Sequence, residues 1–122
     1  MILEGFYRID DIRQNHDGYA FDVTLFSGHK IYDGHFPGTP VVPGVCTLTV
    51  IIEALSKAIG KNMMFSSIKE CKFLAALIPD NDLSIVISMV CGEEGSLRCT
   101  VHNGDVMAMK LNATVAARNG EI

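Results

Sequence analysis

The sequence lacks the features that mark membrane, secreted and nucleic-acid-binding proteins. No stretch is apolar over the ~18–20 residues that a membrane helix needs, and the run Val50–Ile52 ends at Glu53. Residues 1–5 lack the charged start and long apolar core of a secretory signal. The 10 basic residues are outnumbered by 14 acidic ones, whereas nucleic-acid-binding domains usually carry a basic excess. We therefore expect a cytoplasmic protein that binds neither membrane nor nucleic acid.

The cysteines lack the spacing of a metal site or a redox motif. They stand at positions 46, 71, 91 and 99, with no CxxC pair and no His at zinc-finger offsets. In a reducing compartment such cysteines are usually small buried apolar residues, which is what we expect here. Cys46 is the only one of the four that merits consideration as a nucleophile.

Repeats, low-complexity segments and linkers are also missing, so the 122 residues are expected to form a single domain over positions 1–122. With 48% hydrophobic residues, the chain is apolar for its size. Apolar surface that one small core cannot bury is often covered by another subunit. We therefore expect a homodimer or a higher homo-oligomer.

Hydrophobic periodicity predicts one long helix among several strands. Residues 45–59 carry apolar side chains at helical spacing, including Val45, Leu48, Ile52, Leu55 and Ile59, and Gly60 is a natural stop. The segments 6–12 and 19–25 are expected to form a hairpin, and 65–77, 83–89, 97–101 and 106–117 are expected to be strands. The last three strands should form an antiparallel meander, with an Asn103-Gly104 turn before the final strand. This order predicts an α+β fold whose sheet wraps around the helix.

Three of the four prolines and three glycines fall within residues 34–44, Gly-His-Phe-Pro-Gly-Thr-Pro-Val-Val-Pro-Gly. Neither a helix nor a central strand tolerates that composition, so the segment must be a stiff, shaped loop. A rigid loop that presents a histidine is a common setting for chemistry. The other histidines, at positions 16, 29 and 102, lie in turns or near a strand end, and we expect no catalytic role for them.

Residues 34–45 closely resemble the signature loop of the hot-dog-fold 3-hydroxyacyl-[acyl-carrier-protein] dehydratases. The match contains the His, the Phe-Pro-Gly, the second Pro and the Pro-Gly that opens a helix, without a gap. The resemblance implies a hot-dog fold, a lyase of fatty-acid biosynthesis, and a dimer with each site at the subunit interface. It implies an acyl carrier protein or coenzyme A thioester as substrate, and no metal or redox cofactor.

Dehydration removes a proton α to the thioester carbonyl and expels the hydroxyl from C3. His35 suits the role of base near neutral pH. The amides of Gly44 and Val45, at the start of the helix, are expected to polarise the thioester carbonyl. We expect Phe36, Gly44 and Val45 to contact the substrate.

The sequence departs from the family at the residue that protonates the leaving hydroxyl. The family has a Glu or Asp on the helix fourteen residues after the His, and that position is Thr49 here. Glu53 lies one turn further along the same helix face, about 6 Å away. Either Glu53 or a water held by Thr49 could supply the proton. The alternative for Glu53 is a surface residue paired with Lys57.

Two other functions remain open for the same fold. The chain could be an acyl-thioesterase, which needs a positioned water rather than an acid. It could also be a non-catalytic or half-catalytic subunit whose homologous partner supplies the acid. Lys57, Lys61, Lys69 and Lys72 form a basic stretch that could dock an acidic carrier protein or be an ordinary solvated surface.

Overall fold

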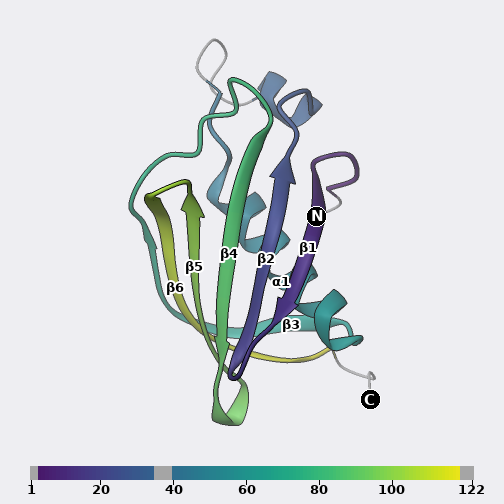
Figure 1. Cartoon of the computed structure of the whole chain (residues 1–122), viewed down its shortest axis with the longest axis vertical. Coiled ribbons are helices and arrows are strands. Elements are labelled where there is room, and N and C mark those ends of the chain that lie inside the picture. The colour runs from purple at the N-terminus through teal and green to yellow at the C-terminus, as the bar shows by residue number, and fades with distance from the viewer. Residues whose placement is uncertain (1–2, 35–39, 119–122) are drawn as a thin grey trace.

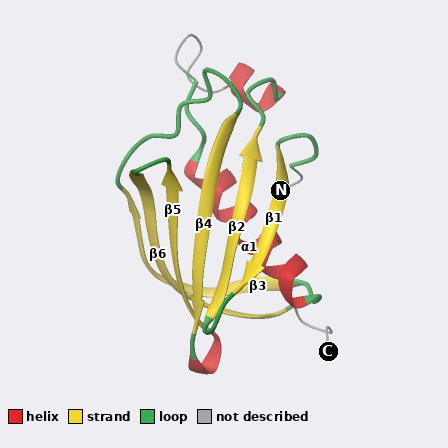
Figure 2. Cartoon of the chain, in the orientation of Figure 1, coloured by secondary structure: helices red, strands yellow, loops and turns green. Residues whose placement is uncertain are grey.

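The computed structural model describes residues 3–34 and 40–118 of the chain. Six strands form one antiparallel sheet in the order β1-β2-β4-β5-β6-β3, which curves around the long helix α1 (Figures 1 and 2). The elements are β1 (Tyr7–Gln14), β2 (Gly18–Leu25), η1 (Lys30–Gly34), α1 (Gly44–Ile59), β3 (Met63–Phe73), β4 (Leu83–Cys91), η2 (Glu93–Gly95), β5 (Ser96–Asn103) and β6 (Val106–Ala117). Among these residues no helix is long and apolar enough to cross a membrane.

The sheet follows the period-two pattern of the sequence. Phe21, Val23 and Leu25 of β2 are at most 1% exposed and point toward the helix, and so do alternate residues of β4, β5 and β6. The expected hairpin is confirmed by the antiparallel pairing of β1 with β2. The expected meander is confirmed by the pairing of β4 with β5 and of β5 with β6. Gly104, with φ of 61°, provides the left-handed residue in the turn between β5 and β6.

The helix was predicted within one residue of its observed start, and its predicted apolar stripe is buried only in part. Fully buried positions are Cys46, Thr47, Val50, Ile51, Ala54 and Leu55. Of the predicted stripe, which also included Ile51 and Ala58, Leu55 and Ile51 belong to this set. Leu48, Ile52 and Ala58 are partly buried against the core, whereas Val45 and Ile59 are 54% and 39% exposed. The reason is that the helix is apolar on most of its circumference, and the curved sheet covers one side of it. A second apolar side of α1, which carries Val45 and Ile59, is therefore only partly covered by this chain.

The third strand ends earlier than predicted, and its continuation shapes the start of the helix. Strand β3 stops at Phe73, and the amides of Leu74 and Ala75 both donate to the carbonyl of Ala108, at 2.8 and 3.3 Å. The chain then leaves the sheet, and the carbonyl of Leu77 accepts a 2.9 Å hydrogen bond from the amide of Val42. The segment 74–77 thus anchors the residues that lead into α1.

Candidate functional site

The loop that sequence analysis singles out is described only in part. His35 and Phe36, the predicted base and one predicted substrate contact, lie outside the described residues. The described chain resumes at Pro40 and enters α1 through Pro43, the N-cap, whose side chain makes no capping bond. The carbonyl of Pro43 accepts from the amides of Cys46 and Thr47 at 3.0 and 3.3 Å.

The predicted donors at the start of α1 are placed as helix geometry requires. Gly44 and Val45 are the first two helical residues, so their amides have no acceptor within the helix. No bond from either amide to another described residue is formed. The positive end of the helix dipole adds to the field at this point. These two amides can therefore donate to an oxyanion or a polarised carbonyl.

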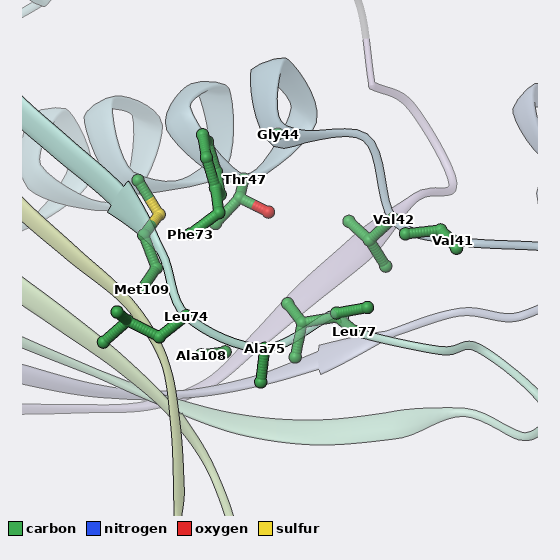
Figure 3. Close-up of a pocket in the computed structure, with 11 residues that line it drawn as sticks. Val41, Val42, Gly44, Thr47, Phe73, Leu74, Ala75, Leu77, Ala108 and Met109 are labelled. Carbon is green, nitrogen blue, oxygen red and sulfur yellow. The ribbon is translucent and has the colours of Figure 1, made fainter.

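An apolar cleft of about 380 Å³ opens beside these amides (Figure 3). Its walls come from the loop before α1, the first turn of α1, the end of β3 with the segment after it, and β6. The lining residues are Val41, Val42, Gly44, Thr47, Phe73, Leu74, Ala75, Ala76, Leu77, Ala108 and Met109. A cleft of this size with an almost wholly apolar lining suits an alkyl chain.

Two residues that the sequence did not single out shape this cleft. The ring of Phe73 lies over Gly44 so closely that a Cβ at position 44 would come within 2.5 Å of it. Thr47, at 5% exposure, is the only buried polar residue in the described part of the chain (Figure 3). Nothing in the sequence pattern brings Phe73 to Gly44, because the contact depends on where β3 ends.

Thr49 and Glu53 lie together in a second cleft of about 470 Å³, which shares no lining residue with the apolar one. The hydroxyl of Thr49 donates to the carbonyl of Val45 at 2.8 Å. The cleft also contains Tyr7 of β1 and Arg118 after β6. At 1.5 Å per residue, Glu53 is about 13 Å along the helix axis from Gly44. Within one chain, the predicted acid and the predicted amide donors are thus held apart.

The carboxylate of Glu53 is bonded to a tyrosine rather than to a lysine. The hydroxyl of Tyr7 donates to Oε1 of Glu53 at 2.6 Å, and no ion pair with Lys57 is formed. Burial first, and then the nearby carboxylate of Glu53, raise the pKa of Tyr7, which keeps its hydroxyl protonated and able to donate. Sequence analysis missed Tyr7, because a strand residue 46 positions away carries no signal of this contact.

The surroundings of Cys46 and His29 indicate structural rather than catalytic roles. Cys46 is fully buried, and burial raises the pKa of its thiol, which disfavours the thiolate that a nucleophile needs. His29 uses both ring nitrogens, since Nδ1 accepts from the amide of Ile31 at 3.0 Å and Nε2 lies 3.1 Å from the carbonyl of Glu4. In residues 3–34 and 40–118, no three His, Cys, Asp or Glu side chains are grouped to hold a metal ion.

The four lysines expected as one patch are spread along the molecule. Lys57 and Lys61 lie at the C-terminal end of α1, whereas Lys72 is the last residue but one of β3. The eleven residues of β3 span about 35 Å at ~3.3 Å per residue, so the two groups lie at opposite ends of a strand. These lysines do not form one compact docking surface.

The chain is similar to known dehydratases in both sequence and fold. The model of the family described as ApeI-like, ApeI dehydratase, matches residues 11–110. The 3-hydroxyacyl-[acyl-carrier-protein] dehydratase FabZ of Levilactobacillus brevis is 33% identical over 104 residues, covering 76% of this chain and 70% of that protein. FabZ of Lactiplantibacillus plantarum is 32% identical over 117 residues, covering 87% and 80%. The dehydratase heterocomplex ApeI:P from Xenorhabdus doucetiae has a chain of the same fold, with a TM-score of 0.71, 21% identity, and coverage of 91% and 97%.

Proposed function

Because the chain belongs to the ApeI-like dehydratase family and has its hot-dog fold, we propose that it converts 3-hydroxyacyl thioesters to enoyl thioesters in fatty-acid or polyketide-like synthesis. The family and the α+β hot-dog arrangement were both expected from the sequence and are confirmed. The observation that carries the proposal is the apolar cleft beside the amides of Gly44 and Val45. We propose that the chain works in the cytoplasm as a single domain over residues 1–122.

The proposed chemistry is an elimination across C2 and C3 of the acyl group. His35 takes a proton from C2, and the electron pair of that bond forms the C2–C3 double bond. Negative charge that develops on the thioester oxygen is stabilised by the amides of Gly44 and Val45. The C3–O bond breaks, and the departing hydroxyl takes a proton from an acid and leaves as water.

We propose Glu53 as that acid in preference to Thr49. The hydroxyl of Thr49 already donates its proton to the carbonyl of Val45. Toward a water molecule this hydroxyl can therefore act only as an acceptor. Glu53 has one oxygen bonded to Tyr7, and its second oxygen can carry the proton. Because Glu53 is remote from Gly44 in its own chain, it would act on substrate held by a second subunit.

The second subunit is proposed to cover the apolar side of α1 that the sheet leaves open. Val45 and Ile59 are exposed on this side, and Leu48 and Ile52 are half-buried there. A homodimer would bury these side chains and bring Glu53 of one chain toward the cleft of the other. The carrier of the substrate is proposed to be acyl carrier protein, which the names of the FabZ relatives specify for those enzymes.

A second proposal is that the acid comes from a homologous partner subunit. It is supported by the threonine at the family's acid position and by the engagement of both Thr49 and Glu53 in bonds within the chain. A structure of the same fold, from Xenorhabdus doucetiae, is described as the dehydratase heterocomplex ApeI:P. In that case the present chain would supply His35 and the amide donors only.

Two substitutions separate these proposals. Glu53→Gln is expected to lower 3-hydroxyacyl turnover by the pure protein by about 10²-fold, the lower end of the usual effect of a general acid. Thr49→Glu is expected to raise turnover, because it restores a carboxyl group at the family position. The measurement is the rate of enoyl-thioester formation, with an unsubstituted acyl thioester as the test for thioesterase activity. Wild-type turnover unchanged by Glu53→Gln would exclude Glu53, and turnover only after addition of a homologous partner would support the heteromeric enzyme.

A further inference from the structure

A groove on the outer face of the sheet carries positive charge that the proposed chemistry does not use. Its volume is about 440 Å³, and it crosses β4, β5, β6 and β3 on the side opposite α1. Arg98 of β5 and Lys110 of β6 stand in it, with Glu70 of β3 as its only acidic residue. Ser88, Thr100 and Asn112 complete its polar lining. We refer to the surface formed by Arg98 and Lys110, which line this groove, and by Lys72, which pairs with Lys110 beside it, as the basic groove.

The placement of these cations on the outer face follows from strand alternation. Leu97, Cys99 and Val101 of β5 are buried against the helix side, so Arg98 and Thr100 between them point outward. In β6, Met109 and Leu111 are buried, and Lys110 between them points outward in the same way. Strand register places Thr100 opposite Lys110, and Lys110 opposite Lys72. The cations therefore lie on adjacent strands of one face.

The cations of the basic groove have few acidic side chains near them. Neither Arg98 nor Lys110 has a carboxylate within 4.0 Å in the part of the chain that the structure describes, and Lys72 has Glu70 at 3.8 Å. By contrast, Arg13 on the opposite edge strand β1 pairs with Asp22 and Asp11 at 2.8 and 2.7 Å. Three cations and one carboxylate thus stand together on a chain whose net charge is −4. Such a local excess attracts an anionic partner.

The basic groove and the apolar cleft lie back to back on the same two strands. Lys72 pairs with Lys110 on the outer face, and the next pair in register, Phe73 with Met109, lines the apolar cleft on the inner face. Strand β3 is an edge of the sheet and ends at Phe73. A partner seated on the basic groove thus has a short path around the end of β3 to the cleft beside Gly44.

We propose that the basic groove docks the acyl carrier protein that delivers the substrate. A carrier protein is acidic and is joined to its acyl arm through a phosphodiester, so its surface and its arm are both anionic. Docking on the outer face would let the arm pass around the end of β3 with the acyl chain entering the apolar cleft. The proposal rests on the proposed function for the identity of the partner, and it assigns the surface to Arg98, Lys110 and Lys72.

Charge reversal in the basic groove tests the assignment. We compare wild type with Arg98→Glu/Lys110→Glu, and use Lys57→Glu/Lys61→Glu at the far end of α1 as the matched control. Substrates are a 3-hydroxydecanoyl thioester on a bacterial acyl carrier protein and the same acyl group on coenzyme A. The groove variant should raise KM for the carrier-bound substrate by about tenfold or more, at unchanged kcat and unchanged turnover of the coenzyme A thioester. Glu70→Gln, which removes the opposing charge, should lower that KM.

Direct binding keeps the test independent of turnover. Fluorescence anisotropy of labelled holo-acyl carrier protein should show weaker binding to the groove variant, unchanged binding to the control variant, and affinity that falls as salt rises. Matching urea midpoints would exclude misfolding as the cause. Unchanged carrier binding by the groove variant, or equal loss of both thioesters, would overturn the assignment. Carrier binding through the groove with no turnover of any thioester would instead count against the proposed function.

Discussion

The hydroxyl groups of Tyr7 and Tyr32 have opposite surroundings, which makes them a matched pair of test sites. Tyr7 donates to Glu53 at 2.6 Å, whereas the buried hydroxyl of Tyr32 has no hydrogen-bond partner among residues 3–34 and 40–118. A bond to a charged group contributes about 1.5–3 kcal/mol, and an unsatisfied buried hydroxyl costs about 1–3 kcal/mol. We therefore expect Tyr7→Phe to lower the free energy of unfolding by about 1.5 kcal/mol or more, and Tyr32→Phe to raise it by about 1 kcal/mol, in urea titrations at pH 7. Tyr32→Phe being destabilising would show that its hydroxyl has a partner.

The same two residues make the fold sensitive to alkali. Burial, followed by the proximity of Cys46, raises the pKa of Tyr32 to about 12, and burial with the Glu53 bond raises the pKa of Tyr7. In the unfolded chain both ionise near 10.0. Their contribution to stability is therefore complete below pH 10 and is lost as pH rises from 10 toward 12.

Thermal unfolding between pH 8 and pH 11 measures this loss. The midpoint should be flat up to about pH 10 and then fall, and the fall should be shallower in Tyr32→Phe than in wild type. A midpoint that fell with the same slope in both proteins would show that other groups cause the alkaline loss.

At the residue scale, the sequence predicts the family better than it predicts side-chain contacts. The Gly-His-Phe-Pro-Gly loop and the Pro43-Gly44 start of α1 are local features, so their family and their amide donors can be inferred directly. The partner of Glu53 could not be predicted, because Tyr7 is brought to it only by the packing of β1 beside α1. The alternative that the sequence left open, an ion pair of Glu53 with Lys57, is not formed, and Oε1 of Glu53 accepts from Tyr7 instead.

Substitution of Gly44, the first residue of α1, is expected to affect the cleft more than the stability of the fold. The three atoms nearest to a Cβ on Gly44 would all belong to the ring of Phe73, an exposed side chain that can move. A Cβ on Gly18 would come within 1.9 Å of the carbonyl oxygen of Met89, a backbone atom in the neighbouring strand. Packing therefore predicts a mild effect on stability at Gly44 and a severe one at Gly18.

We expect Gly44→Ala to change the free energy of unfolding by less than about 1 kcal/mol, while Gly18→Ala costs more than about 2 kcal/mol. Gly44→Ala should still lower kcat/KM for 3-hydroxyacyl thioesters by at least about tenfold, because the displaced Phe73 ring narrows the cleft beside the amide donors. The two measurements are urea unfolding and steady-state kinetics. Full activity in Gly44→Ala would show that substrate does not pass between Gly44 and Phe73.

At the element scale, the sequence located the helix and the strands but did not show which side of the helix is exposed. Period-two alternation fixes which side chains of β2 and β4 to β6 face inward, so those strands were predicted well. Helix α1 is apolar nearly all round. Its sequence alone does not distinguish the side that packs on the sheet from the side that carries Val45 and Ile52. The end of β3 was missed because Leu74 to Leu77 remain apolar after the strand has left the sheet.

The whole molecule is expected to be a homodimer. One chain leaves Val45 and Ile59 exposed on α1, and it leaves β3 as a sheet edge with Met64 and Ile68 exposed. Burial of this surface is favourable by roughly 25 cal/mol per Å². Light scattering at micromolar concentration should give twice the 13.3 kDa of one chain. Ile52→Asp should shift the protein toward the mass of one chain, and a wild-type mass near 13 kDa would exclude the homodimer.

The most direct test of the proposed activity is the identity of the product made from a 3-hydroxyacyl group on acyl carrier protein. Mass spectrometry of the carrier after incubation with the pure protein should show the acyl chain still attached and lighter by one water. The His35→Ala variant should form this product at least about 10²-fold more slowly, as expected for loss of the general base. Release of free acid and bare carrier would show a thioesterase instead, and equal dehydration by wild type and His35→Ala would contradict the assignment of His35 as the base.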